Sequence, residues 1–485
     1  MTFNFRHKNY TPLFAMALGA FTSSLSASPS MSAPQLTISG QSTFNAWWFE
    51  NKQQKYRNDS DFGQGFALGQ IFGPGQGLPL DNSQMRGYGR GYLFTMDDSR
   101  LKFDVSGKTD PGMDYGFAVL VNTSTEQTSY DKTIKESYIW AGGSWGRLTF
   151  GNTDGVEDIM AFGGFDPLGG TGGFDGNFDR VVNFVTGTVT SIDLVGDTGK
   201  STKVMYQTPR YYGFQGGISF TPQTGHQGEA KINSSRDYGK KGELNAFDRR
   251  SIAGGLNFLN KWNNGFELGL SGTAIFAKTQ PEYTGDNWTL VDTDGQIVAT
   301  NIGNNSGERK NTASFALGTM MRYAGFELGF EFGNNSRSGQ IKDLQVETGG
   351  PKTNSGWFID TGLAYSWGPT KFSIGYMYTK RKAMGLRGTF ANGNLEFFKA
   401  KNRTNILSTS IDHKLAPGVG VYFEYAHYDM KNEGFNVDAM LHNSLNLAPA
   451  ATPGVVVSAT GGSFTGPVGP KQKSDAFVLG TKVKF

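Results

Sequence analysis

The chain contains no cysteine, which excludes a disulfide framework and any metal site built on thiolates. Charged residues are also scarce, at 18% of the chain against roughly 25% in an average soluble domain. Long apolar runs are missing as well, because the apolar segment at residues 12–21 falls well short of the roughly 18 residues that a membrane-spanning helix needs. These absences argue against a helical membrane protein, and a net charge of only +3 argues against a basic nucleic-acid-binding protein.

Glycine and aromatic residues, in contrast, are abundant. Gly accounts for 68 of the 485 residues, about twice its average usage, and there are 38 Phe and 19 Tyr. So much aromatic content with so little net charge disfavours intrinsic disorder. Together with a mean hydropathy of −0.40, the composition indicates many strands and turns.

The first 32 residues have the layout of a secretory signal peptide. Arg6 and Lys8 give a positive start without any acid, residues 12–21 form an apolar core, and residues 22–32 are mostly small and polar. More than one position fits the small-x-small cleavage rule, so the cleavage site is placed only within residues 26–33. We therefore predict a signal peptide at 1–32 and one mature domain at 33–485.

Apolar and polar residues alternate along most of the mature chain. Around residues 325–333, for example, Phe326, Leu328 and Phe330 share one face, whereas Glu327 and Glu331 share the other. Strict alternation predicts strands with one apolar and one polar face. Sixteen strands are predicted, near residues 35–49, 99–107, 113–122, 133–141, 145–152, 201–208, 213–221, 250–259, 264–277, 311–322, 325–333, 355–367, 371–379, 403–413, 418–427 and 474–485.

The connections between these strands alternate between short and long. Short turns include residues 109–112, 323–324 and 416–418, and the long segments are 50–98, 153–200, 221–249, 278–311, 334–355, 380–402 and 428–473. This segregation is typical of a transmembrane β-barrel with tight periplasmic turns and long extracellular loops. Because lipid cannot satisfy polar side chains, the apolar face must meet hydrocarbon and the polar face must line a water-filled lumen. The predicted fold class is all-β, a transmembrane antiparallel β-barrel of 16 strands.

The alternation also predicts where two groups of side chains lie in the barrel. Aromatic residues at strand ends are interpreted as girdles at the membrane interfaces, namely Trp47, Trp48, Tyr365, Trp367, Tyr376, Tyr378 and Tyr425. Charged residues on the polar faces are interpreted as lumen hydration or salt bridges, namely Glu267, Glu327, Glu331, Asp360, Lys371 and Glu424.

Several segments resemble the general porins of Gram-negative bacteria, a family of trimeric outer-membrane proteins. Residues 99–103 (SRLKF) and 110–116 (DPGMDYG) are similar to that family's second strand, turn and third strand, and residues 136–142 (ESYIWAG) and 146–151 (GRLTFG) to its fourth and fifth strands. Residues 203–209 (KVMYQTP) and 421–427 (VYFEYAH) resemble its sixth and fifteenth. The terminal Phe485 on an amphipathic strand resembles the signal read by the barrel assembly machinery of the outer membrane.

This resemblance implies that the third extracellular loop, residues 153–200, folds into the barrel and narrows the pore. Ahead of its first basic residue the loop carries six acids, Asp154, Glu157, Asp158, Asp166, Asp175 and Asp179. The polar faces of strands two to six supply bases for the opposite wall, Arg100, Lys102, Lys135, Arg147 and Lys203. Acids facing bases would set a transverse field across the narrowest section. The family often has Arg after the glycine that closes strand five, where this chain has Asn152.

The sequence thus predicts a general diffusion porin that passes ions and small hydrophilic solutes through the outer membrane of a Gram-negative bacterium. A homotrimer is implied by the resemblance, and outer-membrane lipid and lipopolysaccharide are expected partners; nucleic acid is not. No enzyme activity, cofactor or metal site is predicted. Residues 292–295 (DTDG) resemble the start of a calcium loop but lack its later glutamate. The alternatives are a substrate-specific channel, for example for sugars, and a surface adhesin or structural barrel.

Overall fold

The computed structural model describes residues 34–53, 89–109, 112–123, 134–182, 194–224, 248–279, 288–291, 297–301, 310–340, 354–389, 394–432, 456–458, 463–464 and 471–485. The predicted signal peptide at 1–32 lies outside these residues.

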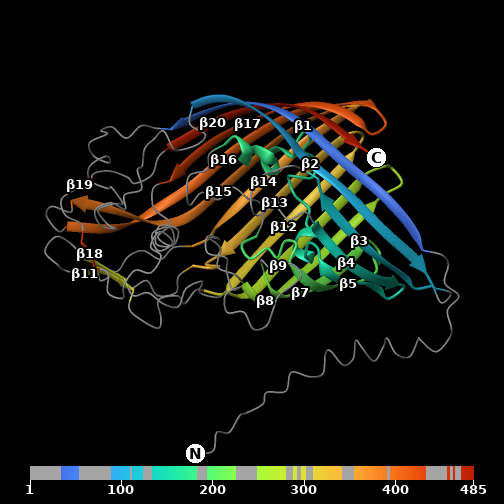
Figure 1. Ribbon diagram of the computed structural model, residues 1–485, viewed down its shortest axis with the longest axis horizontal. Helices are drawn as coiled ribbons and strands as arrows, with labels where there is room; N and C mark the ends of the chain where they lie inside the picture. Colours follow the sequence, from blue (N-terminus) through green and yellow to red (C-terminus); the bar gives the residue numbers. More distant parts are fainter. Residues whose placement is uncertain are drawn as a thin grey trace, which may run out of the picture.

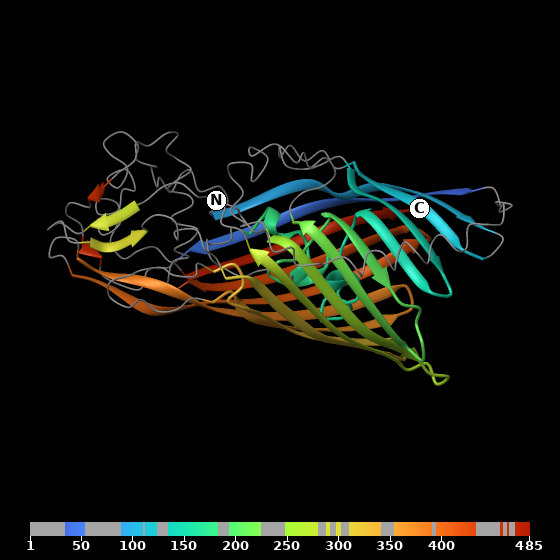
Figure 2. The same ribbon diagram turned by 90° about the horizontal axis from the view of Figure 1, so that it is seen from below.

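Sixteen strands form one closed antiparallel barrel (Figures 1 and 2), in agreement with the predicted fold class. Each strand pairs with the next barrel strand along the chain, so the sheet is a simple meander. The strands are β1 (Gln35–Gln53), β2 (Gly89–Lys108), β3 (Asp114–Asn122), β4 (Ile134–Gly143), β5 (Gly146–Asn152), β6 (Thr202–Gln207), β7 (Phe214–Gln223), β8 (Asp248–Lys261), β9 (Glu267–Thr279), β12 (Thr312–Tyr323), β13 (Phe326–Ser336), β14 (Gly356–Trp367), β15 (Thr370–Thr389), β16 (Asn394–Ala416), β17 (Val419–Asn432) and β20 (Lys471–Lys484).

The first and last strands close the barrel. β1 pairs with β20 from Gln41 opposite Lys484 to Gln53 opposite Gln472. At the end of this seam Gly40 and Phe485 each donate the main-chain N–H to the other's carbonyl oxygen, both at 3.0 Å. Closure leaves no strand edge open to pairing with another chain, and it satisfies the main-chain groups that hydrocarbon could not.

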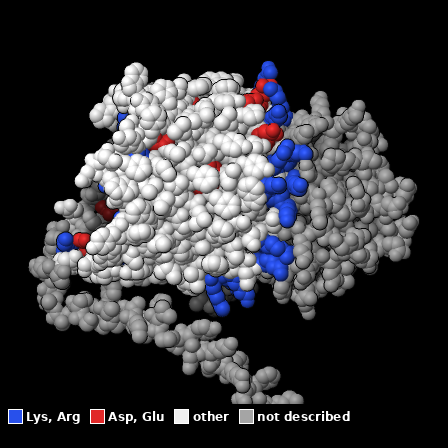
Figure 3. Space-filling model, turned by 180° about the vertical axis from the view of Figure 1, so that it is seen from behind, with Lys and Arg blue, Asp and Glu red and all other residues white. Residues whose placement is uncertain are grey.

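The strands turn their apolar faces outward. On β17, Phe423 is 45% exposed on the outside of the barrel, whereas its neighbour Glu424 is completely buried inside. The same alternation places Leu270, Phe330 and Leu479 on the outside. Figure 3 shows the resulting belt, which carries few charged residues except along its rims. This is the surface expected of a barrel whose outside meets lipid and whose inside meets water.

The short connections lie together at one end of the barrel. Between β12 and β13 the turn consists of Ala324 and Gly325, with φ of 49° and 86°. Positive φ at both central residues defines the type I′ turn, whose twist matches that of the flanking strands. The predicted segregation of short turns from long connections is therefore confirmed.

Several strands extend beyond their predicted ranges, and three of them, β2, β15 and β16, do so by about ten residues. β2 begins at Gly89 instead of near residue 99, because a bulge at Asp98 (φ 46°) interrupts the alternation there. β15 continues as far as Thr389, and β16 already begins at Asn394. Most of the predicted loop at 380–402 is therefore a paired hairpin. Beyond the membrane both faces of a strand can be polar, so pairing continues where the apolar period has ended.

Short strands also occur inside segments that were predicted to be loops. β10 (Trp288–Val291), β11 (Ile297–Asn301) and β18 (Val456–Ser458) form a separate small sheet, and β19 (Ser463–Phe464) pairs with the end of β15. Strands of two to five residues are too short for a period of two to be recognised.

No helix among the described residues combines the length and the apolar character needed to cross a membrane.

Candidate functional site

The long connection between β5 and β6 enters the barrel. Its described parts, residues 153–182 and 194–200, contain α4 (Val156–Ile159), η1 (Gly173–Asp175) and η2 (Asn177–Arg180). α4 packs against β7, β8 and β9, and both Val156 and Met160 are fully buried there. Figure 1 shows these helical turns within the outline of the barrel. The third loop therefore folds into the lumen, as the resemblance implied.

Side-chain oxygens of the wall hold this loop by its main-chain N–H groups. Along the chain, Phe162 N donates to Ser271 Oγ (2.8 Å), Gly164 N to Asp360 Oδ1 (2.7 Å), Gly169 N to Ser373 Oγ (3.0 Å) and Gly170 N to Asp412 Oδ1 (2.9 Å). The acceptors belong to β9, β14, β15 and β16. Hydrogen bonds to a carboxylate are shorter and stronger than neutral ones. The loop is thus fixed to one side of the inner wall by groups on four strands.

Glu424 on β17 makes the largest number of these contacts. Its Oε2 accepts from the N–H of Thr171 (2.7 Å) and from Thr171 Oγ1 (2.8 Å), and its Oε1 accepts from the N–H of Gly173 (2.8 Å). From β20, Lys482 Nζ donates to the carbonyl oxygen of Gly170 at 3.2 Å. The glutamate is completely buried, because the loop covers it. One wall side chain therefore satisfies three donors at the tip of the loop.

Small residues on the wall allow the loop to approach this closely. Residues that are cross-strand partners of one another form a row around the inner face of the wall. Apart from Met320, which lies between the first two, the row consists of small residues: Gly269, Gly329, Gly362, Gly375, Ser408 and Ala426. A Cβ atom at Gly329 would collide with the carbonyl oxygen of Gly163, and one at Gly362 with that of Gly164. These two wall glycines therefore have a steric role, because no side chain fits beneath the loop there.

An aromatic cluster fixes the next part of the loop. Phe178 is fully buried, with its ring 5.3 Å from that of Trp47 in an edge-to-face arrangement and 6.0 Å from that of Tyr428. Asn51 Nδ2 donates to the carbonyl oxygen of Val181 at 2.8 Å. The interpretation of Trp47 as a girdle residue is therefore wrong. It lies on the inner face of β1, whereas its neighbour Trp48 is exposed on the outside.

Three of the predicted site residues lie where the loop leaves and rejoins the wall, a region we call the loop neck. Asp154 pairs with Lys200, whose Nζ also lies 2.8 Å from Glu136 of β4. Glu157 accepts from Thr198 N (3.0 Å) and Thr198 Oγ1 (2.5 Å), and only 6% of it is exposed. These two acids are therefore engaged within the neck.

Lys203 is the third of these residues. Its ammonium group donates to the carbonyl oxygens of Thr153 and Gly199, and only 2% of the residue is exposed. At Lys200, burial lowers the pKa, but the hydrogen bonds to Asp154 and Glu136 outweigh it and raise the pKa above its ordinary value. Lys200, through Glu136 on β4, and Lys203, from β6, together hold the two ends of the loop against the wall.

The remaining loop acids differ in exposure. Asp158 and Asp175 are exposed, and Asp166 accepts from the N–H of Gly163 at 2.8 Å. Burial raises the pKa of the Asp166 carboxyl above its ordinary value. The side chain of Asp179 lies outside the part of the structure that is described.

The other wall bases lie on β2, β4 and β5. Arg100 donates from Nη2 and Nε to the side-chain oxygen of Gln41 at 2.8 and 3.0 Å, with the Gln41 amide oriented to accept. Lys102 pairs with Asp104 at 3.3 Å. The guanidinium carbon of Arg147 lies 4.2 Å from the ring centre of Trp140, a cation–π contact. Lys135 is half-buried at the bulge between β3 and β4.

The lumen acids that were expected to form salt bridges divide into two groups. Arg322 bridges Glu267 (3.0 Å) and Glu327 (3.2 Å), and Lys371 pairs with Glu327 at 2.9 Å, as expected. Asp360 and Glu424 instead bind the loop backbone, a role that the sequence reasoning missed. It missed Asp412 altogether. The only available signal was the presence of acids on inner strand faces together with a glycine-rich loop.

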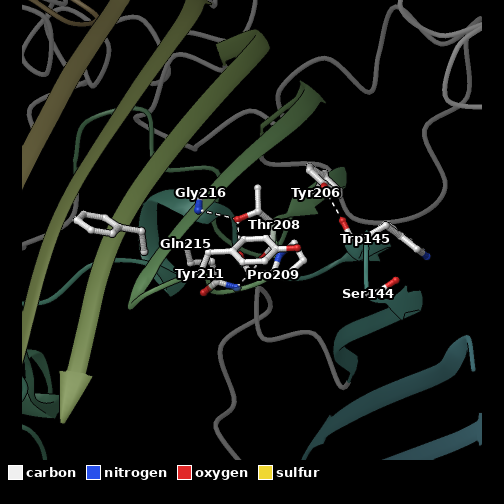
Figure 4. Close-up of a pocket in the computed structure, with 9 residues that line it drawn as sticks. Ser144, Trp145, Tyr206, Thr208, Pro209, Tyr211, Gln215 and Gly216 are labelled. Carbon is white, nitrogen blue, oxygen red and sulfur yellow. Dashed lines mark hydrogen bonds between the residues drawn. The ribbon is translucent and has the colours of Figure 1, made fainter. Parts of the chain in front are cut away.

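A cavity of about 400 Å³ lies at the turn end of the barrel and not in the lumen (Figure 4). It is lined mainly by Trp145, Tyr206, Tyr211 and Phe214, from the β4–β5 and β6–β7 connections. Tyr206 Oη donates to the carbonyl oxygen of Trp145 at 2.6 Å, and their rings are nearly parallel. Aromatic side chains at this level are typical of the membrane interface. The cavity contains none of the predicted site residues, and the described residues hold no cluster suited to a metal ion.

The profile of the Gram-negative porin family matches residues 15–433, which is most of the chain. The chain belongs to this family. The family and the fold indicate an outer-membrane channel and not an enzyme. Among curated relatives, uncharacterized proteins of Rickettsia typhi and Rickettsia prowazekii are 25% and 23% identical to this porin over 356 residues, which cover 65% of it and 74% of each relative.

Several solved structures are also similar to this porin. An anion-selective porin from Comamonas acidovorans is 12% identical, with a TM-score of 0.47, over 93% of this chain and 100% of that one. The in-vitro folded OmpT of Vibrio cholerae, in its trimer form, is 11% identical, with a TM-score of 0.45, over 94% of this chain and 100% of that one.

Proposed function

We propose that this porin is a general diffusion channel that passes ions and small hydrophilic solutes passively. The observation that carries the proposal is the attachment of the third loop to one side of the wall. Its main-chain contacts run along β9 and β14–β17, so we expect the passage to lie along β2–β5. A fixed loop beside a polar wall narrows a water-filled barrel without sealing it.

The charges beside this passage suit polar solutes. Arg100, Lys102 and Arg147 lie on the β2–β5 side, and the exposed Asp158 and Asp175 lie on the loop. We propose that these residues set a transverse field that orients dipolar solutes and disfavours apolar ones. Asp154, Glu157 and Lys203 drop out of this proposal, because their contacts are structural bonds in the loop neck.

A substrate-specific channel for sugars would need accessible aromatic side chains along the lumen. Trp47, Phe178 and Tyr428 are large aromatic residues on the inner side, but all three are buried where the loop meets the wall. Most exposed aromatic residues of the described strands, such as Phe276 and Phe330, are on the lipid-facing side. The placement of aromatics therefore favours general diffusion.

We further propose that the porin is a homotrimer and that Phe485 is its assembly signal. Both proposals rest on the family resemblance. Chemical cross-linking of the protein in native membranes should stop at a three-subunit species. Deletion of Phe485 should lower the amount of folded protein in the outer membrane.

Two measurements test the channel proposal. The purified protein should give stepwise conductance in planar bilayers, and liposomes containing it should swell at rates that fall smoothly as the sugar becomes larger. An absence of steps would favour an adhesin or structural barrel. Fast swelling with one sugar, out of line with its size, would favour a substrate-specific channel.

A further inference from the structure

The seam between the first and last strands differs from the other strand pairs of the described barrel. β1 and β20 run side by side (Figure 1) and pair from Gln41 to Gln53, yet they come from opposite ends of the chain. The other neighbouring strands follow one another along the chain, so a turn or loop keeps them near each other even when they are unpaired. Bringing the two chain ends together therefore costs the most conformational entropy, and contacts that span this seam matter most for keeping the barrel closed.

A line of buried polar side chains crosses the seam on the inner face of the barrel. Tyr422 of β17 lies opposite Gly480 of β20, which in turn lies opposite Asn45 of β1. The Tyr422 hydroxyl reaches over β20 and donates to Asn45 Oδ1, and Asn45 Nδ2 donates to Asp97 Oδ2 on β2 at 2.6 Å. None of these three polar side chains is more than 3% exposed. Hydrogen bonds thus connect β17 with β1 and β2, and the last strand lies between them.

Gly480 makes this crossing possible. A Cβ atom there would collide with the ring of Tyr422, because the ring lies directly on the main chain of the last strand. Lys482, two residues further along β20, places its ammonium group 5.5 Å from the centre of the same ring, a cation–π contact. The tyrosine therefore contacts β20 through its ring and β1 through its hydroxyl.

The third loop spans the same seam. The ring of Phe178 contacts Tyr428 on the β17 side and Trp47 on the β1 side, and all three rings are at most 2% exposed. Two residues further along the loop, Arg180 forms an ion pair with Asp97 of β2 at 3.6 Å. The loop thus contacts strands on both sides of the seam, and it meets the line of polar side chains at the same aspartate.

We propose that the third loop has a second role, which is to clamp the closing seam of the barrel from the inside. The seam clamp consists of two loop residues and three wall residues, namely Phe178, Arg180, Asn45, Asp97 and Tyr422. Phe178 has partners on both sides of the seam, so docking of this part of the loop and closure of the seam favour each other. Unfolding then begins at the seam, while contacts elsewhere in the barrel are still intact. The inference does not depend on general diffusion, because it concerns the closure of the barrel and not its passage.

The first test is the rate at which the full mature porin unfolds when it is heated in detergent, measured on gels as loss of the folded form. Phe178→Ala/Arg180→Gln should unfold at least about tenfold faster than the unmodified protein, because a buried aromatic ring and the ion pair with β2 are both lost. Met160→Ala is the matched control. Met160 is equally buried in the same loop but packs against β7 and β8. Its contacts are still intact when the seam opens, so the rate should change by less than about twofold.

The wall part of the clamp is tested by Tyr422→Phe. This variant keeps the ring over Gly480 and removes only the hydroxyl, so the barrel should fold normally. Loss of one buried hydrogen bond across the seam should make it unfold about threefold faster. If the double loop variant fails to fold, this milder variant still decides the question, because an unchanged rate would exclude the hydrogen-bonded line from the clamp.

Because the chain has no cysteine, an introduced disulfide can report on the seam directly. Ala46→Cys/Leu479→Cys joins outward-facing partners of β1 and β20, and Leu328→Cys/Leu363→Cys joins outward-facing partners of β13 and β14. The oxidised seam pair should return the double loop variant to slow unfolding, whereas the oxidised pair between β13 and β14 should not.

Several results would overturn the proposal. An unchanged unfolding rate in the double loop variant would remove the loop from closure of the seam. An equal acceleration in Met160→Ala would reduce the effect to a general loss of loop packing. Restoration by both disulfides, or by neither, would mean that unfolding does not begin at the seam.

Discussion

Truncation of Glu424 should release the tip of the third loop while the barrel stays closed. In the substitution Glu424→Ala, the main-chain N–H groups of Thr171 and Gly173 and the hydroxyl of Thr171 lose their common acceptor. A hydrogen bond to a charged group contributes about 1.5–3 kcal/mol, and water recovers part of this when the donors are released. We therefore expect loop docking to weaken by about 3–5 kcal/mol, or roughly 10²- to 10⁴-fold in the docking equilibrium.

The direction of the movement follows from the geometry. The wall blocks the loop on one side, so a released tip can move only toward the axis of the pore. Single-channel recordings in planar bilayers should therefore show excess current noise and brief closures, with a lower mean conductance than in the unmodified protein. The strand pairing of Glu424 is made by its main chain, so heat resistance of the folded barrel on gels should change little.

Glu267→Ala is the matched control. Glu267 is also an inner-face glutamate, but its described partner is Arg322 and not the loop. Quiet, full-size openings are expected from this variant. Openings of Glu424→Ala that are equally quiet and equally large would refute the reasoning, because they would show that the three hydrogen bonds do not hold the tip in place.

Three further predictions concern the same loop. Gly362→Ala should also produce noisy openings, because its Cβ would collide with the carbonyl oxygen of Gly164, whereas Gly254→Ala, with no atom within 4 Å of its Cβ, should not; quiet openings from both variants would contradict the steric role of Gly362. Charge reversal at the exposed Asp175, and likewise at Asp166, should move the reversal potential in a salt gradient toward anion selectivity, and an unchanged potential in both would exclude these residues from the constriction. Burial raises the pKa of Asp166 above 3.8, the ordinary value for an aspartate. As the pH falls, this side chain should therefore become protonated at a higher pH than an exposed aspartate would. The selectivity difference between the unmodified protein and Asp166→Asn should therefore decline with a midpoint above pH 3.8, and a midpoint at or below pH 3.8 would disprove the shift.

Much of the barrel could be predicted because its controlling signal is local. A strand that faces lipid on one side must alternate, so Phe423 and Glu424 already showed from adjacent positions which side is which. The alternation failed to predict strands where one side of the strand no longer faces lipid or where a bulge interrupts the pattern. The hairpin beyond Lys380 and Arg403 has no lipid-facing side, and the bulge at Asp98 shifts the period by one residue.

The site was harder to predict, because its contacts depend on register around the barrel. Gly164 and Asp360 are 196 residues apart, and Thr171 and Glu424 are 253 residues apart. No spacing rule connects such pairs. Acidity alone was also misleading: Glu157 and Asp154 matched the expected composition of a pore-lining loop, yet both are engaged in the loop neck.

The attachment between loop and wall is made mainly through main-chain atoms of the loop, and this has a consequence for how such channels can diverge. The wall carboxylates bind N–H groups, which almost every residue type possesses, and the wall glycines accommodate carbonyl groups that never change. The charge of exposed loop residues, such as Asp158 and Asp175, can therefore change while these main-chain hydrogen bonds remain. Mutation can therefore alter the charge of the passage one residue at a time, while the width of the passage stays the same.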